Sequence, residues 1–227
     1  MGEGSDGAFG FNWRSAAQAP KVVRIHRRSS MALFTRRENP PFESNYRKYR
    51  PFLRWDFLVQ CAYCERTEEY LGGEEAFDVE HFKPRSKFPD LTSTYSNLYY
   101  VCRHCNGHKW ETWPSEGQIA RGLRFADPCA EDPYEHHLRE REDGQLEELT
   151  ACGAYSNGHI RLDRHELRKW RRLRSEARRD LPKLTALARR LAEDVSSNDG
   201  PDRDQAAELL DALRRRIEES RRRFSIE

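Results

Sequence analysis

Long hydrophobic runs are absent from this sequence of 227 residues. No window approaches the roughly 18 uninterrupted apolar residues that cross a membrane, and residues 1–18 lack the apolar core of a secretory signal. We therefore expect a cytoplasmic protein that has no contact with a membrane. Apolar residues make up only 37% of the chain, against 34% charged residues. Because so few apolar side chains are available, we expect a small compact unit with helical extensions rather than one large core.

A large excess of charge of one sign is also absent, since the formal net charge is only +2. The charges are nevertheless unevenly distributed. Residues 1–50 contain ten Lys or Arg against four acids, and residues 161–180 contain nine against four. Clustered basic faces suit polyanions such as nucleic acids. The alternative for each region is a solvated charged face without a ligand.

Cysteine is scarce, but its spacing is informative. Four of the six cysteines form two pairs with two intervening residues, "CAYC" and "CRHC", and 37 residues separate the pairs: Cys61, Cys64, Cys102 and Cys105. Two such turns can complete the tetrahedral four-thiolate shell of a structural zinc site. The alternative is buried cysteines or disulfides, and disulfides are disfavoured in the cytoplasm. We expect Cys129 and Cys152 to be small buried side chains.

We expect four segments along the chain. Residues 1–44 are polar and basic without a sustained apolar period, which indicates an irregular N-terminal arm. Residues 45–128 begin with aromatic residues at helical spacing, up to about residue 60, and hold both cysteine pairs. Residues 129–161 predict an irregular connector with two short strands around Asp143 and Gly144. From residue 162 to 227, leucines recur every three or four residues and predict amphipathic helices, with a kink or restart at residues 180–182.

The segment between the cysteine pairs predicts a ββα unit. "FDVEHFKP" reads as one strand that ends at Pro84, and "SNLYYVC" reads as a second strand that runs into the second pair. "CNGHKWETW" can then open a short helix. The predicted fold class is therefore α+β: a ββα core clipped by a four-cysteine zinc site, followed by a mainly helical C-terminal region.

This unit would bring together polar groups suited to catalysis. Glu80, His81 and Asn106 can form an oxygen-rich metal site with an imidazole beside it. Hard oxygen ligands suit Mg²⁺ or Mn²⁺ and leave positions open for water and phosphate. A neutral histidine can take a proton from water, as a general base does in hydrolysis.

The run "CAYC … DVEHFKP … SNLYYVCRHCNGHK" resembles the HNH endonucleases of the four-cysteine zinc type, over about 50 residues. The resemblance implies that His81 is the general base and that Glu80 is a metal ligand. It implies that Asn97 holds the hairpin and orients the histidine, that Asn106 is the second metal ligand, and that Lys109 contacts a phosphate.

One departure leaves the metal ligand open. Many members of that family have Asp or His where this chain has Glu80, and alternate residues of a strand share a face, so Asp78 could serve instead. The longer run "EHFKPRSKFPDLTSTYSNL" is also similar to HNH subunits of bacterial anti-phage systems, among them the Septu and retron-associated effectors.

The function predicted from these patterns is a metal-dependent HNH endonuclease, acting on DNA rather than RNA, as an effector of anti-phage defence. Six basic side chains are expected to contact the nucleic acid: Lys83, Arg85, Lys87, Arg168, Arg171 and Arg172. The alternative is a zinc-stabilised nucleic-acid-binding or scaffold module without catalysis. We also expect the C-terminal leucine stripes to bind a protein partner, such as an ATPase, or a second copy of the chain. The alternative is a hairpin in which the two stripes bury each other.

Overall fold

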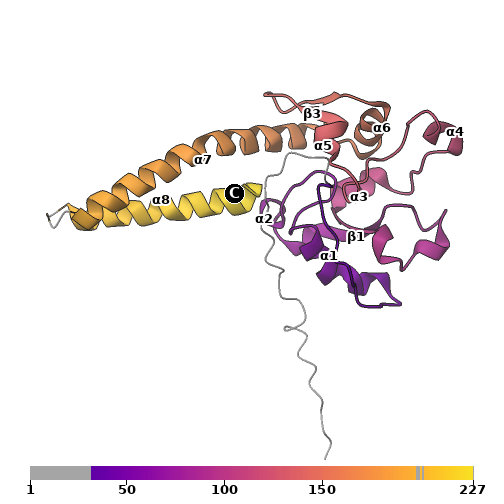
Figure 1. Cartoon of the computed structure of the whole chain (residues 1–227), viewed down its shortest axis with the longest axis horizontal. Coiled ribbons are helices and arrows are strands. Elements are labelled where there is room, and N and C mark those ends of the chain that lie inside the picture. The colour runs from indigo at the N-terminus through magenta and orange to yellow at the C-terminus, as the bar shows by residue number, and fades with distance from the viewer. Residues whose placement is uncertain (1–31, 198–199, 201, 227) are drawn as a thin grey trace, which may run out of the picture.

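The computed structural model describes residues 32–197, 200 and 202–226. Figure 1 shows a body of short elements from which a long helical hairpin projects. Most of the basic arm expected at residues 1–44 lies outside the described residues. Within the described ranges, no helix is long and apolar enough to cross a membrane.

The described end of the expected arm packs onto the body. Phe34 is buried and its backbone N–H donates to the carbonyl of Pro128 at 2.9 Å. Arg37 forms an ion pair with Asp56 at 2.9 Å. A single aromatic anchor such as Phe34 has no sequence period, so the apolar pattern could not predict this attachment.

The helix expected from about residue 45 to 60 is present but shorter. The 3-10 helix η2 (Tyr46–Tyr49) leads into α1 (Arg50–Asp56), and the Asn45 side chain caps η2 by accepting from the Arg47 N–H. Pro51 is tolerated because it lies in the first turn, where its missing N–H has no helical partner. Left-handed φ angles at residues 58 and 59 end the helix early.

The expected ββα unit follows. Strands β1 (Phe77–His81) and β2 (Leu98–Cys102) pair antiparallel, with Phe77 opposite Cys102 and His81 opposite Leu98. All five residues of β2 are buried, and α3 (Arg103–Lys109) begins directly after it. The fold class predicted from the sequence is confirmed.

Short elements complete the body around this unit. They are α2 (Glu68–Leu71), η3 (Glu74–Ala76), η4 (Pro89–Leu91), η5 (Tyr95–Asn97) and α4 (Glu116–Ile119). The core is rich in aromatic side chains, among them the stacked rings of Phe77 and Tyr100.

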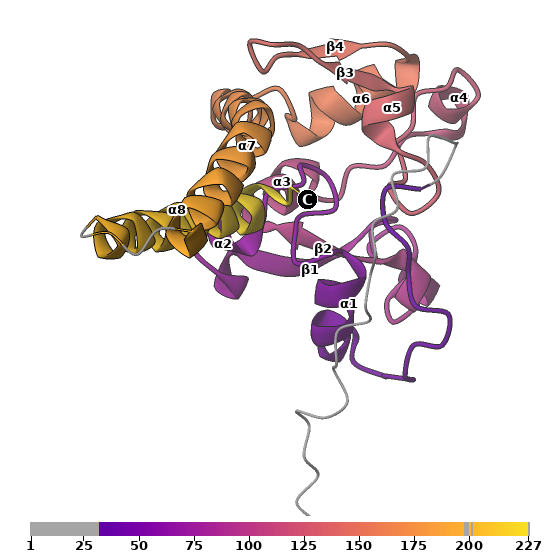
Figure 2. The same cartoon turned by 60° about the vertical axis from the view of Figure 1, so that its left-hand side comes forward.

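Residues 129–161 are more regular than expected. The two strands around Asp143 and Gly144 are present as β3 (Leu138–Glu140) and β4 (Leu146–Glu148), and Gly144 supplies the left-handed φ of 81° that their turn needs. The expectation of irregular structure missed two helices, α5 (Pro133–His136) and α6 (Ala151–Ile160). Figure 2 shows β3, β4 and α6 on one side of the ββα unit and α1 on the other.

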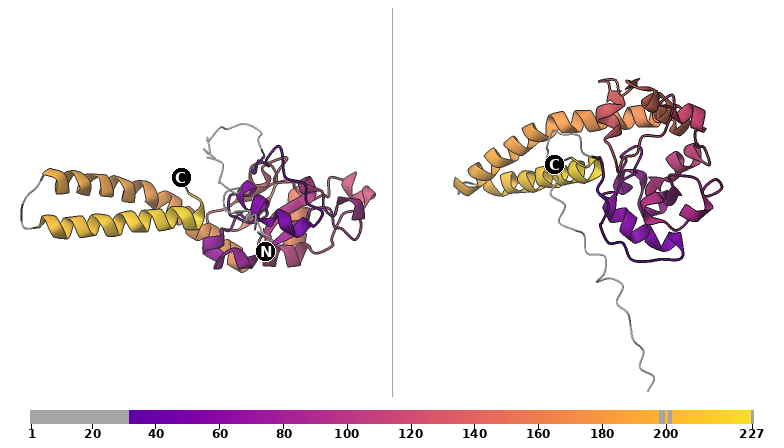
Figure 3. Two further views of the ribbon diagram at one scale, coloured as in Figure 1. Left: turned by 90° about the horizontal axis from the view of Figure 1, so that it is seen from below. Right: turned by 45° about the vertical axis from the view of Figure 1, so that its right-hand side comes forward.

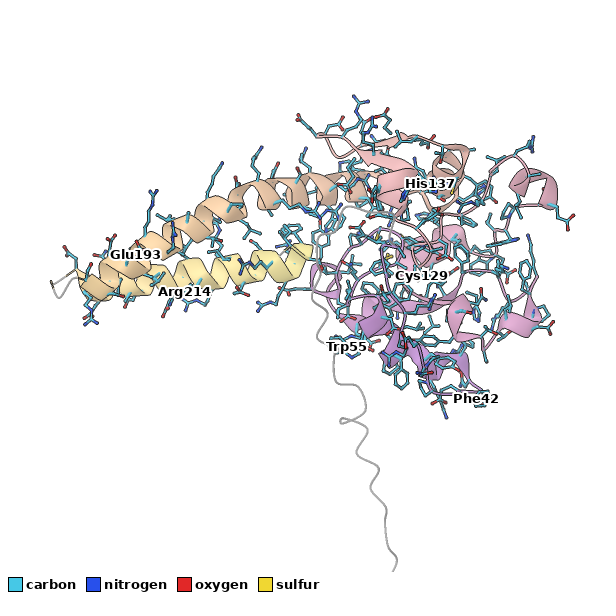
Figure 4. All side chains as sticks on the ribbon, viewed as in Figure 1. Phe42, Trp55, Cys129, His137, Glu193 and Arg214 are labelled. Atoms are coloured by element: carbon cyan, nitrogen blue, oxygen red, sulfur yellow. The ribbon has the colours of Figure 1, made fainter. Side chains whose placement is uncertain are left out.

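The C-terminal region consists of α7 (His165–Ser197) and α8 (Arg203–Phe224). The two helices run side by side (Figure 3), and their leucine stripes bury each other through Leu181, Ala188, Leu210 and Ile217. The expected restart at residues 180–182 is absent, because α7 continues through Pro182 as one helix, which Figure 1 shows bending along its length. Figure 4 labels Glu193 on α7 and Arg214 on α8, on the hairpin arm remote from the body.

Candidate active site and metal centres

Four cysteine sulfurs converge at the corner between β2 and α3. Cys61 and Cys64 lie in the turn after α1, Cys102 ends β2, and Cys105 lies in the first turn of α3. All four are buried and none forms a disulfide. Their sulfur atoms all lie within 4.8 Å of one another.

This cluster fits a zinc ion. The Sγ atoms of Cys64 and Cys102 are 3.9 Å apart, and tetrahedral bonds of about 2.3 Å place two ligand sulfurs roughly 3.8 Å apart. Two guanidinium groups approach from outside: Arg66 is 3.8 Å from the sulfur of Cys102, and Arg164 is 3.4 Å from that of Cys105. Their positive charges offset part of the negative charge of four thiolates.

His81 ends β1, and its ring is half-buried. Its Nε2 lies 2.9 Å from the carbonyl oxygen of Thr92. Because a carbonyl can only accept, Nε2 carries the proton and Nδ1 keeps its lone pair. Burial is the main cause that lowers the pKa of His81 below its usual value. The ring, which also packs edge-on against Tyr46 at 4.7 Å, can therefore accept a proton at Nδ1 near neutral pH.

Glu80, the metal ligand implied by the resemblance, lies in a buried network. Its side chain is 3% exposed. One carboxylate oxygen accepts from the Tyr63 hydroxyl at 2.8 Å, and the other accepts from the Lys109 ammonium at 2.5 Å. Both oxygens are thus already engaged within the protein.

Lys109 completes this network rather than facing solvent. Its side chain is fully buried, and its Nζ also donates to the backbone carbonyl of His81 at 3.1 Å. A direct contact with a phosphate, as the resemblance implies, would require the ion pair with Glu80 to open. In this arrangement Lys109 ties α3 to the end of β1.

Asp78 and Asn106 form the more accessible pair of possible metal ligands. The Asp78 side chain is 39% exposed, and the Asn106 amide lies 3.3 Å from its carboxylate. The Arg103 guanidinium is 3.6 Å from the other carboxylate oxygen. One carboxylate and one amide oxygen suit Mg²⁺, which keeps several waters and needs few protein ligands.

Asn97 fastens the loop that follows β1. Its Oδ1 accepts from the Lys83 N–H at 2.8 Å, and its Nδ2 donates to the Lys83 carbonyl at 3.0 Å. A third contact reaches the Leu91 carbonyl at 3.4 Å. This loop carries Thr92, the partner of His81, so Asn97 is placed to hold the histidine in position.

An open cavity of about 390 Å³ collects these groups, with Asp78, Glu80, His81 and Asn106 among its lining residues. Sequence reasoning did not select the other lining residues, among them Tyr46, Arg103 and Trp110. Tyr46 had no signal, because it lies 35 positions before His81. Trp110 did have a signal in the sequence, because a large aromatic residue directly follows Lys109 in the motif.

Comparison with known proteins bears on this site. Residues 61–111 match the family model described as HNH endonuclease. This segment is an HNH endonuclease domain. The chain is also 34% identical over 65 residues to the Septu protein PtuB of Bacillus thuringiensis, in an alignment that covers 26% of this chain and 24% of that protein. The chain thus matches about a quarter of the length of that relative.

Three of the six expected nucleic-acid contacts lie within the HNH domain itself. Lys83, Arg85 and Lys87 are exposed on the loop after β1, and Arg85 also lines the cavity. The Lys87 ammonium lies 3.4 Å from the carbonyl of Trp113.

On α7 the expectation was wrong for Arg171. Its side chain is 2% exposed and donates to the carbonyls of Gly144 and Leu162 and to the carboxylate of Asp163, at 2.7, 2.9 and 3.1 Å. Arg171 therefore joins the β3–β4 turn to α7 and cannot meet a phosphate. Arg168 also pairs with Asp163, at 2.6 Å, whereas Arg172 is exposed.

A second group of possible metal ligands lies outside the HNH domain, at Glu131, His137 and Cys152. His137 bonds to Glu131 at 2.9 Å and to the Thr150 hydroxyl at 2.8 Å. Arg124 also holds Glu131, through two bonds of 2.6 and 3.0 Å. Since a guanidinium already neutralises the only carboxylate, this group is better suited to joining the connector to the body than to binding a cation.

Proposed function

We propose that the chain is a metal-dependent endonuclease that hydrolyses phosphodiester bonds of nucleic acid, with DNA as its substrate. The observation that carries this proposal is the cavity onto which His81, Asp78 and Asn106 all open. A zinc-stabilised scaffold would need the four cysteines but not an imidazole and a carboxylate beside one open cavity.

In this mechanism His81 is the general base. The Thr92 carbonyl fixes the ring and holds the proton on Nε2, so Nδ1 takes the proton from the attacking water. Burial keeps the ring neutral near pH 7, because it lowers the pKa. Asn97 keeps this loop in place by binding Lys83 and Leu91, the residue directly before Thr92.

We assign the catalytic metal ligands to Asp78 and Asn106. Glu80 is the less suitable acid, because Tyr63 and Lys109 already occupy its carboxylate. A divalent ion such as Mg²⁺ or Mn²⁺ would neutralise charge on the phosphate. Arg85 and Arg103, which line the same cavity, would bind the neighbouring phosphates.

The four cysteines would hold zinc as a structural ion. With four protein ligands, the shell has no open position for a substrate. Its task is to fasten the turn after α1 to the corner between β2 and α3.

A role in anti-phage defence is supported by the partial similarity to Septu protein PtuB. We propose that the helical hairpin, which lies outside the HNH domain, connects that domain to a protein partner.

The test is cleavage by the purified protein. Labelled single- and double-stranded DNA and RNA are incubated with Mg²⁺ or Mn²⁺, beside His81→Ala and Asp78→Asn variants. We expect cleavage that needs an added divalent ion and that falls about 10²- to 10⁴-fold in the His81 variant, the usual loss for a general base. Binding without cleavage under all conditions would favour the scaffold alternative. Cleavage by His81→Ala at the parental rate would refute the assignment of the base.

A further inference from the structure

Trp110 is unusually exposed for a tryptophan. Its relative exposure is 73%, although it directly follows the buried Lys109 and lines the cavity that contains His81. Tryptophan is highly buried on average in proteins. Trp113, three residues later, behaves in that usual way, because it packs against Phe82 and Phe88 at 5.5 and 5.6 Å. The exposure therefore belongs to one ring at the cavity, and not to the whole segment.

The backbone of Trp110 also departs from what local stability favours. Its φ is 48° and its ψ is −137°, in a region that L-residues rarely adopt and that glycine adopts freely. Its N–H donates to the Asn106 carbonyl at 2.8 Å and closes the last turn of α3. A glycine would end the helix there with less strain. The contacts around Trp110 therefore give no structural reason for a large side chain at this position.

The surroundings of the ring suit a nucleotide. Arg85 and Arg103 line the same cavity and can bind phosphates, and Asp78 and Asn106 stand where we place the reacting phosphate. An exposed aromatic face beside bound phosphates is the arrangement by which proteins hold unpaired bases, because every base has a π-face. In a duplex those faces are covered by their stacked neighbours.

We propose that Trp110 stacks on an unpaired base next to the scissile phosphate, and that the preferred substrate is therefore single-stranded or locally unpaired nucleic acid. This inference rests on the proposed nuclease function. It adds the class of substrate and a residue that selects it.

The experiment measures binding apart from cleavage. In a His81→Ala background, the affinity for a dye-labelled single-stranded oligonucleotide is measured by fluorescence anisotropy, beside a duplex and a strand of the same length whose central nucleotides are abasic. We expect Trp110→Ala to weaken single-strand binding about 5- to 150-fold, the range for loss of one stacked base. Trp110→Phe should keep most of the affinity, and the duplex and abasic strand should bind equally to all variants.

Two further variants exclude trivial explanations. Trp110→Gly removes the ring and also the backbone strain, so it should bind as weakly as Trp110→Ala while unfolding at the same temperature as the parent or higher. Phe42 is 91% exposed and lies at the edge of the body (Figure 4), and it is not among the residues that line the cavity. Phe42→Ala, a matched loss of an exposed ring, should leave binding unchanged.

The outcomes separate this inference from the function on which it rests. Parental single-strand affinity in Trp110→Ala, or an equal loss on the abasic strand or the duplex, would overturn the stacking role and leave the nuclease intact. If the background protein binds no nucleic acid at all, the proposed function fails and this inference fails with it.

Discussion

At the scale of single residues, the site depends on which charges are buried. Glu80 and Lys109 form an ion pair whose side chains are 3% and 0% exposed, directly behind His81. Asp78, two positions before Glu80 on the same strand, keeps its carboxylate accessible. The structure thus separates two acids that look equivalent in the sequence: both line the cavity, but only Asp78 has an accessible carboxylate, whereas that of Glu80 is paired with Lys109.

Lys109→Met should therefore destabilise the protein. The change leaves the Glu80 carboxylate buried without its partner, and loss of one member of a buried pair costs about 3–5 kcal/mol. Urea unfolding should show the loss, and adding Glu80→Gln should restore much of it. Lys87→Met, at an exposed lysine, should change the free energy of unfolding by no more than about 0.5 kcal/mol. If Lys109→Met weakens nucleic-acid binding but unfolds like the parent, Lys109 contacts the phosphate after all.

Glu131 should make stability depend on acidic pH. Although burial raises its pKa, hydrogen bonds from Arg124 and His137 outweigh burial and lower the pKa to about 2. The unfolded chain takes up this proton near pH 4.5, so the stabilisation is present above that pH and is lost as pH falls toward 2. Allowing for solvent screening at a partly exposed group, we expect the parent to lose about 1–2 kcal/mol relative to Glu131→Gln between pH 6 and pH 3. The urea midpoints of both proteins across this range measure the difference. Both proteins contain the same cysteines, so proton uptake by these side chains cancels in the comparison. If the difference between the two proteins stays constant across this pH range, the bonds of Glu131 to Arg124 and His137 contribute nothing to stability.

At the scale of elements, the ββα unit is held together from two directions. The cysteine cluster joins the turn after α1 to β2 and α3, and the Ala62 N–H donates to the Tyr100 carbonyl at 2.9 Å beside it. On the other side, Lys109 ties α3 to β1. Strands of five residues are too short to be stable without such support.

We expect one tightly bound zinc per chain, and we expect Cys102→Ser to lose the zinc and to be strongly destabilised. Structural zinc contributes directly to folding energy, so removal of one ligand should lower the melting temperature by more than about 10 °C. Elemental analysis and thermal unfolding measure the two effects. Cys129→Ser, outside the cluster, should keep the zinc. Absence of stoichiometric zinc in the parent, or normal folding of Cys102→Ser, would contradict the assignment.

At the scale of the whole molecule, the hairpin is attached to the body at its base. The end of α8 meets α2, where the Thr67 hydroxyl donates to the Arg223 carbonyl at 2.8 Å and Tyr70 contacts Phe224 with ring centres 6.2 Å apart. Trp170 of α7 also contacts Tyr70, with ring centres 6.2 Å apart. The two leucine stripes bury each other, which is the hairpin alternative drawn from the sequence. Binding of a partner by the hairpin stays a prediction.

Phe224→Ala should loosen this attachment. Phe224 is 8% exposed, and truncation of a buried phenylalanine costs about 3 kcal/mol or more. Amide hydrogen exchange should accelerate in α8 and in the base of α7, while the HNH domain keeps its protection. Leu209→Ala, at a residue 60% exposed on the same helix, is the matched control and should change stability by no more than about 0.5 kcal/mol. Equal exchange in both variants would show that the hairpin does not depend on this joint.

The sequence by itself determined the features whose signals are local. The spacing of Cys61, Cys64, Cys102 and Cys105 predicted a cluster, and the leucine period predicted the C-terminal helices. The run "FDVEHFKP" predicted the strand β1, although the strand ends at His81 and not at Pro84. These signals survive because a turn, a strand or a helix imposes its own spacing on the chain. The same reasoning missed α5 and α6, which are short and have weak periodicity.

Only the tertiary structure decided which charged side chains face solvent. Arg171 reads like its basic neighbours in the sequence but is buried on Asp163 and on the Gly144 carbonyl. Lys109 meets Glu80, which lies 29 positions earlier. Burial of a charge depends on a partner brought close by the fold, and that partner leaves no trace in the neighbouring residues. For the same reason, only the tertiary structure showed that the Trp110 ring is exposed at the cavity.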